Sequence, residues 1–141
     1  EFDEIYDSIV YSTFLALGFI FVENIIYIYD LKLDLIEIVL RSVMSCGIHF
    51  ALGVIMGYFL GYAKDNQVNS KYLNSITDIF LAFLIPSILH GLYNLLISLS
   101  MTNSDISLFV VFYVFCLFTV SYILFTRYLK LRNNNFVSFN N

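Results

Sequence analysis

The sequence predicts an all-α protein, a polytopic membrane bundle of about four transmembrane helices. Three observations lead to this class. First, 60% of the 141 residues are hydrophobic and only 13% are charged, whereas a soluble domain carries about 25% charged residues. Second, four apolar runs reach the roughly 20 residues that a helix needs to cross the hydrocarbon core of a bilayer. Third, none of these runs alternates polar and apolar residues as the strands of a membrane barrel do.

The first two runs predict helices over Ile5–Tyr29 and Leu35–Ala63. One face of the first helix carries five residues at helical spacing: Ser12, Ala16, Phe19, Glu23 and Tyr27. The second helix contains a glycine at every fourth position: Gly53, Gly57 and Gly61. Small residues at this spacing let two helices approach closely in lipid, so we expect the glycine face to pack against a neighbouring helix.

The third and fourth runs predict helices over Tyr72–Ser100 and Ile106–Tyr128. The single proline, Pro86, lies inside the third run, where neighbouring helices can satisfy the carbonyl group that it frees. We expect a kink at Pro86 to open a small cavity. The fourth run is rich in Phe, Val and Tyr and is expected to act as scaffold.

Short connections at Asp30–Asp34, Lys64–Lys71 and Met101–Asp105 make the helices alternate in direction. Basic residues gather on one side of the predicted bundle: Lys64, Lys71, Arg127, Lys130 and Arg132. The other side holds Lys32, with Arg41 further along the second helix. The positive-inside rule therefore predicts a multi-pass cell-membrane protein whose N- and C-termini are cytoplasmic. Residues 1–132 would form the transmembrane domain and residues 133–141 a polar cytoplasmic tail.

Composition also limits the partners. No basic patch is interleaved with aromatic residues, so binding to nucleic acid is not expected. The chain opens with Glu1-Phe2-Asp3-Glu4, which lacks an initiator Met and is acidic where a signal peptide would be basic. We therefore expect an N-terminally truncated piece of a larger bundle, with the lipid bilayer as its main surroundings.

Three ionisable side chains lie inside three different apolar runs: Glu23, His49 and His90. Polar companions accompany them: Asn24, Arg41 and Asn94. Ionisable groups are costly inside a membrane helix, by roughly 2.5–3.5 kcal/mol for Asp, Lys or Arg at its centre, so they usually mark a functional site. At about 1.5 Å per residue, Glu23 and His90 lie roughly 9 and 15 Å from the outer helix ends. His49 lies roughly 12 Å beyond Arg41, which is expected to snorkel to the outer interface. The similar depths predict one site.

Two histidines and a carboxylate suit two kinds of hydrolytic chemistry. They could bind a catalytic Zn²⁺ in a His₂Glu arrangement with one open position. Without metal, the glutamate could activate water while a histidine stabilises the oxyanion or protonates the leaving amine. The sequence contains neither HExxH nor GxSxG, so zincin and serine-hydrolase sites are not expected. Two facing histidines would also suit a haem or a proton relay.

Ordered sequence blocks resemble the PrsW family of intramembrane proteases. Before and along the first predicted helix they are Glu1-Phe2-Asp3-Glu4, Asp7, Val10-Tyr11, Gly18-Phe19, Glu23-Asn24 and Tyr27. On the second they are Arg41, His49, Gly53 and Gly57, and on the third Pro86 and His90-Gly91-Leu92-Tyr93-Asn94. The likeness covers roughly residues 1–98. The family is similar to the CAAX prenyl endopeptidases and to the Aph-1 scaffold of γ-secretase.

The resemblance implies hydrolysis of peptide bonds in a transmembrane or membrane-anchored protein substrate. By position, Glu23 and Asn24 match the family's second motif, His49 the third and His90 the fourth. The family's first motif, a Glu-Glu pair followed by a basic residue, lies on a preceding helix, and Glu1 and Glu4 do not reproduce it. We therefore expect this piece to be inactive alone if that pair supplies the base. A non-catalytic scaffold of the Aph-1 type is the alternative.

Overall fold

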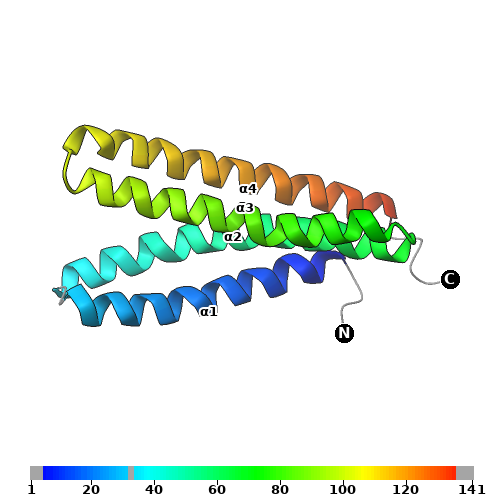
Figure 1. Ribbon diagram of the computed structural model, residues 1–141, viewed down its shortest axis with the longest axis horizontal. Coiled ribbons are helices and arrows are strands. Elements are labelled where there is room, and N and C mark those ends of the chain that lie inside the picture. Colours follow the sequence, from blue (N-terminus) through cyan, green and yellow to red (C-terminus); the bar gives the residue numbers. More distant parts are fainter. Residues whose placement is uncertain (1–4, 32–33, 136–141) are drawn as a thin grey trace.

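The computed structural model describes residues 5–31 and 34–135, which form four long helices and one short 3₁₀ turn (Figure 1). The elements are α1 (Ile5–Leu31), α2 (Leu35–Val68), α3 (Tyr72–Ser100), η1 (Ser104–Ile106) and α4 (Ser107–Asn135). Each of the four α-helices is long and apolar enough to cross a membrane, and the described residues include no strand. The predicted all-α membrane bundle is confirmed.

The helix ends differ from the prediction where the chain becomes polar. Helix α2 runs to Val68 rather than Ala63, so the predicted connection Lys64–Lys71 is too long. Helix α3 has the predicted bounds. The predicted end of α2 was too early because hydropathy falls where a helix leaves the membrane, whereas the helix itself can continue through polar residues. Ser70, with φ 59°, makes the turn between α2 and α3.

Helix α4 also continues beyond the predicted end. It reaches Asn135 instead of Tyr128, so the first three residues of the predicted polar tail 133–141 are helical. The rest of that tail, residues 136–141, lies outside the described residues, as does Lys32 of the first connection.

The start of α2 is fixed by a capping box. The Asp34 carboxylate accepts a hydrogen bond of 2.8 Å from the backbone N–H of Glu37. The Glu37 carboxylate in turn accepts a bond of 3.1 Å from the backbone N–H of Asp34. This reciprocal pair satisfies two of the backbone donors that a helix leaves free at its beginning. It therefore defines the end of α2 that lies nearest to Arg41.

Helix α2 is the centre of the bundle and packs against α1, α3 and α4 (Figure 1). The backbones of α1 and α3 do not come close to each other over the described residues, so contact between these helices depends on side chains that bridge the gap, such as Glu23 and His90. The beginning of α1, the α2–α3 connection and the end of α4 lie at one end of the bundle (Figure 1). This arrangement matches the predicted alternation of helix direction.

The glycine face of α2 lies against α1, as predicted. A Cβ atom added at Gly53 would lie 2.8 Å from the Cα atom of Thr13. One added at Gly57 would lie 2.4 Å from the Cα atom of Ile9. These separations are shorter than any real carbon contact, so only glycine permits the two backbones to come this close.

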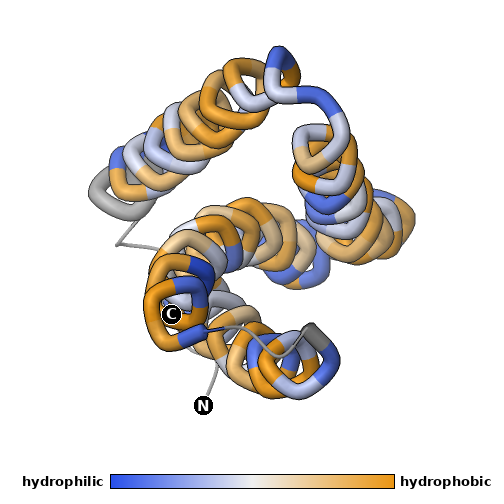
Figure 2. The backbone as a smooth tube through the Cα atoms, turned by 90° about the vertical axis from the view of Figure 1, so that its left-hand side faces the viewer, coloured by the Kyte–Doolittle hydropathy of each residue, from blue (hydrophilic) through white to orange (hydrophobic). Residues whose placement is uncertain are grey.

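The interior is thin, and most large apolar side chains point outward. The largest buried cluster contains Ile48, Leu52, Ile55 and Leu117. Phe14 and Phe21 of α1 are each 68% exposed, and Leu73 of α3 is 79% exposed. Viewed from the end of the bundle, hydrophobic residues cover most of each helix (Figure 2). Such an apolar exterior is what a bilayer solvates and water does not.

Candidate active site

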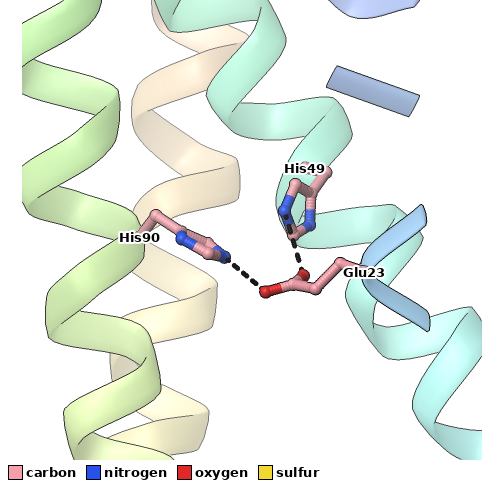
Figure 3. A group of neighbouring side chains, drawn as sticks. All are labelled: Glu23, His49 and His90. Carbon is pink, nitrogen blue, oxygen red and sulfur yellow. Dashed lines mark ion pairs between the residues drawn. The ribbon is translucent and has the colours of Figure 1, made fainter. Parts of the chain in front are cut away.

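Glu23, His49 and His90 meet in space from three helices (Figure 3). The Nε2 atom of His49 lies 3.5 Å from Oε2 of Glu23. The Nε2 atom of His90 lies 3.7 Å from Oε1 of the same carboxylate. Glu23 on α1 therefore faces His49 on α2 with one oxygen and His90 on α3 with the other. The predicted convergence of the three side chains is found in the fold.

A backbone hydrogen bond fixes the His49 ring. Its Nδ1 atom lies 2.9 Å from the carbonyl oxygen of Ser45, one turn earlier on α2. A carbonyl oxygen can only accept, so Nδ1 carries a proton and donates it to this bond. In the neutral ring the lone pair is then on Nε2, the nitrogen that faces Glu23.

The three side chains are shielded to different degrees. The His49 side chain is 6% exposed, the Glu23 side chain 15% and the His90 side chain 21%. Phe19, one turn before Glu23 on α1, covers both histidines: its ring stacks on His49 at 5.8 Å and meets the edge of His90 at 6.2 Å. His90 is thus the most accessible of the three groups.

The two imidazole rings are also in contact with each other. Their centroids are 4.7 Å apart, with an angle of 65° between the ring planes. Such close rings leave no room for a porphyrin between them, so the geometry does not favour a haem ligated by both histidines.

Several atoms of the site are enclosed without a hydrogen-bond partner. Both Nε2 atoms, of His49 and His90, are in this condition. Buried polar atoms normally have a partner, so an unpaired pair of nitrogens aimed at one carboxylate needs an explanation. A bound cation would supply it, because neutral imidazole nitrogens and carboxylate oxygens are electron-pair donors.

The spacing of these donor atoms fits a small cation. One donor atom from each of Glu23, His49 and His90 can be chosen so that all lie within 4.8 Å of one another. Ligands about 2.0–2.2 Å from a tetrahedral Zn²⁺ are separated by roughly 3.3–3.5 Å, close to the observed 3.5 and 3.7 Å from nitrogen to oxygen. The residues present therefore fit a divalent metal with His₂Glu ligation, in which these three described ligands leave a fourth position open.

None of the three predicted supporting residues is hydrogen-bonded to this group in the part of the chain that the structure describes. The side-chain oxygen of Asn24 is enclosed and has no partner among the described residues. Asn94 is half-buried one turn after His90, and no hydrogen bond links these two side chains in the part of the chain that is described. The guanidinium group of Arg41 lies over the ring of Tyr27, with 3.6 Å between Cζ and the ring centroid.

Two features of the site were not predicted from the sequence. The Ser45 carbonyl that orients His49 is a backbone group, so the side chain at position 45 gave no signal for it. The contact between the Tyr27 ring and Arg41 was partly indicated by the sequence, because Tyr27 lies one turn after Glu23 on the same face of the first helix. It was missed because the contact depends on the register between α1 and α2.

Helix α4 supports the site from behind α3. The hydroxyl group of Tyr113 donates a hydrogen bond of 2.7 Å to the carbonyl oxygen of Leu89, the residue before His90. Tyr113 and Leu89 both pack on the cluster around Ile48, which adjoins His49 on α2. The fourth helix, expected to be scaffold, thus helps to position the backbone that carries His90.

Comparison with known proteins assigns the family. Residues 1–122 match the family model described as PrsW family intramembrane metalloprotease. A protein named Protease PrsW from Oceanobacillus iheyensis is 43% identical over 97 residues, which are 69% of this chain and 42% of that protein. Those from Bacillus subtilis and Geobacillus kaustophilus are 33% and 37% identical over 98 and 97 residues, which are 70% and 69% of this chain.

The chain spans about two-fifths of the length of these relatives: 42% of the Bacillus subtilis protein and 40% of the Geobacillus kaustophilus protein. No solved structure matches it. The family model covers most of the chain, including all three residues of the Glu-His-His group. The chain therefore belongs to the PrsW family of intramembrane metalloproteases.

Proposed function

We propose that this chain forms the metal-binding part of an intramembrane endopeptidase, which hydrolyses peptide bonds of a membrane-protein substrate. The observation that carries the proposal is the meeting of Glu23, His49 and His90 inside a bundle of membrane-length helices. Each residue comes from a different helix. An ionisable side chain inside a membrane helix is energetically costly, and such residues usually mark a functional site.

In this proposal the three side chains hold one divalent metal ion, with zinc as the first candidate. A zinc ion bound there supplies a Lewis acid that activates water near neutral pH and polarises a carbonyl group. His49 presents the lone pair of Nε2 because its Nδ1 proton is held by the Ser45 carbonyl. Glu23 presents one oxygen toward each histidine, so a cation bound between the three side chains would meet a donor atom from each of them.

A metal-free version of the same site is the rival mechanism. Glu23 would then take a proton from the attacking water, and His90 would protonate the leaving amine. His90 suits that role because it is the more exposed of the two histidines. The two versions differ in one measurable property, the metal content of the active protein.

The proposed orientation follows from the basic residues of the described chain. Lys64, Lys71 and Arg127 lie near the end of the bundle that holds the α2–α3 connection. By the positive-inside rule this end faces the cytoplasm, and the Glu-His-His group then lies in the opposite half of the membrane. Cysteine labelling of each connection from outside intact cells would test this orientation.

The test of the proposal uses the full-length protein together with a membrane substrate. Glu23→Gln, His49→Gln and His90→Gln keep the side chains similar in size and remove one donor each. We expect each to abolish cleavage and to reduce bound metal to background. Asp78→Asn is the matched control: Asp78 lies on α3 near the α2–α3 connection, where it accepts a hydrogen bond of 2.7 Å from Asn66.

The outcomes separate the alternatives. Loss of both metal and cleavage in the three variants supports the metal site, with Asp78→Asn behaving as wild type. Loss of cleavage in a wild-type protein that never contains stoichiometric metal supports the metal-free mechanism. Unchanged cleavage in all three variants would remove this group from the reaction, and a folded full-length protein without cleavage of any membrane substrate would favour a scaffold.

A further inference from the structure

Arg41 is held in a fixed position against Tyr27, one helical turn beyond Glu23 on α1. Its guanidinium lies 3.6 Å above the ring of Tyr27, and the side chain is half-buried. The Nε atom is enclosed and has no hydrogen-bond partner. A guanidinium stacked on an aromatic face is attracted by the ring electrons and loses its freedom to reorient.

The charge of Arg41 has no close anionic partner among the described residues. The ion pairs found there join Glu23 to the two histidines and do not include Arg41. No described residue accepts a hydrogen bond from it, yet its two terminal nitrogens are not enclosed as Nε is. The end of the guanidinium, with a pair of parallel donors, is therefore free to meet a ligand.

The position of Arg41 sets its distance from the reacting group. Arg41 lies eight residues before His49 on α2, which is about 12 Å along the helix axis. Its platform, Tyr27, lies one turn beyond Glu23 on α1. An extended peptide advances about 3.3 Å per residue. A peptide bound across the Glu-His-His group toward the α1–α2 connection would reach Arg41 after about three to four residues.

We propose that Arg41 is a specificity-determining residue that binds a carboxylate of the substrate, about three to four residues from the scissile bond. The inference rests on the proposed protease function, because it takes the Glu-His-His group as the place where the peptide is cut. The carboxylate has two sources: the side chain of Asp or Glu within the substrate, or the free C-terminus of a peptide that ends there.

A carboxylate suits this residue better than a backbone carbonyl. The two terminal N–H groups of a guanidinium form a planar pair that matches both oxygens of a carboxylate. The Arg41 side chain is also half-buried against Tyr27, where an ionic ligand gains more from a fixed charge than it would on a fully exposed surface. Tyr27 occupies one face of the guanidinium and leaves its edge available.

The test measures binding rather than turnover. The full-length protein with Glu23→Gln is purified in non-ionic detergent, so that the probes stay intact. Four fluorescent apolar peptides are compared, carrying either Glu or Gln at one position and ending in either a free carboxylate or an amide. This set of four is made in several versions, which place the Glu or Gln three or four residues from the N-terminus or from the C-terminus. Dissociation constants are read from fluorescence anisotropy.

We expect at least one carboxylate peptide to bind about 10-fold more tightly than the Gln amide peptide, because hydrogen bonds to charged groups are the stronger ones. Arg41→Gln should remove this preference, and Arg41→Lys should keep part of it. Arg127→Gln is the matched control, since Arg127 is an exposed arginine of α4 on the far side from the site. A preference for the Glu amide peptide identifies a side chain as the source, and one for the Gln acid peptide a C-terminus.

Two results would overturn the inference. One is a carboxylate preference that persists in Arg41→Gln. The other is equal affinity for all four peptides in the protein that keeps Arg41. If Arg41→Gln then weakens all four, Arg41 contacts a backbone carbonyl of the peptide; if it weakens none, Arg41 makes no contact with the peptide. Neither result depends on cleavage, so both leave the proposed protease function to be judged by its own experiment.

Discussion

Replacing Gly57 with alanine should separate α1 from α2 at their closest approach. The new Cβ atom would lie 2.4 Å from the Cα atom of Ile9, 2.8 Å from the carbonyl oxygen of Ser8 and 2.9 Å from the backbone nitrogen of Ile9. All three are backbone atoms, so no side chain can rotate away. Ordinary carbon contacts are about 3.5–4.0 Å, which means that α1 must retreat by about 1 Å or more.

The expected cost has two parts. Overpacking of this kind usually costs about 1–3 kcal/mol of folding free energy. The same movement would stretch the hydrogen bond of 2.8 Å that the Ser8 hydroxyl donates to the Gly57 carbonyl, which adds about 0.5–1.5 kcal/mol. We therefore expect Gly57→Ala to lower the free energy of unfolding by about 1.5–4.5 kcal/mol.

The assay is equilibrium unfolding of the full-length protein in mixed detergent micelles, followed by helical circular dichroism and by steric trapping. Gly18→Ala is the matched control, because a Cβ atom added at Gly18 of α1 has no atom within 4 Å. It should leave stability unchanged or raise it by up to about 1 kcal/mol, the ordinary gain of alanine over glycine inside a helix. If Gly57→Ala and Gly18→Ala unfold at the same denaturant concentration, the close contact between α1 and α2 is not what the chain adopts in a membrane.

Four further predictions concern single contacts. Ser8→Ala should destabilise the protein by about 1–2 kcal/mol, because the buried hydroxyl bonds to the Gly57 carbonyl and lies 3.2 Å from the Tyr128 hydroxyl; unfolding as above measures it, and no change would contradict it. Tyr113→Phe keeps the packing and removes the bond to the Leu89 carbonyl, so about 0.5–1.5 kcal/mol should be lost in the same assay. Tyr27→Leu should cost about 0.5–2 kcal/mol through loss of the cation–π contact, and Tyr27→Phe should cost less. Zinc at 100 times its dissociation constant should stabilise the full-length protein by about 2.7 kcal/mol, seen as a raised Tm that is absent in Glu23→Gln.

The membrane helices were predictable because each is marked by its own sequence. A run of apolar residues sets where a helix crosses lipid, and the third helix was predicted with its observed bounds. The ends of the first, second and fourth helices were not, because outside the membrane polar residues such as Asp30, Asp65 and Asn66 extend a helix as well as apolar ones do. Local hydropathy indicates which residues lie in the membrane, but it does not show where the helical backbone begins and ends.

The meeting of Glu23, His49 and His90 was predictable from depth. Short connections force the helices to alternate, and residues at equal depth on neighbouring helices must then lie close in one dimension. What depth does not give is rotation about each helix axis. The seat of Arg41 on Tyr27 and the hydrogen bond from His49 to the Ser45 carbonyl depend on that rotation. Both arise from tertiary packing around the glycine face of α2.

The central place of α2 has a consequence for biosynthesis. During insertion the chain leaves the ribosome in order, so among the four described helices α1 and α2 are the first that can pair, through the glycine face. That hairpin brings Glu23 and His49 together but contains no residue of α3. His90 arrives only with the next segment, and the Tyr113 support for its backbone arrives later still. The nascent chain therefore holds only two members of the Glu-His-His group until α3 is inserted, so under the proposed function this part of the site is incomplete until that step.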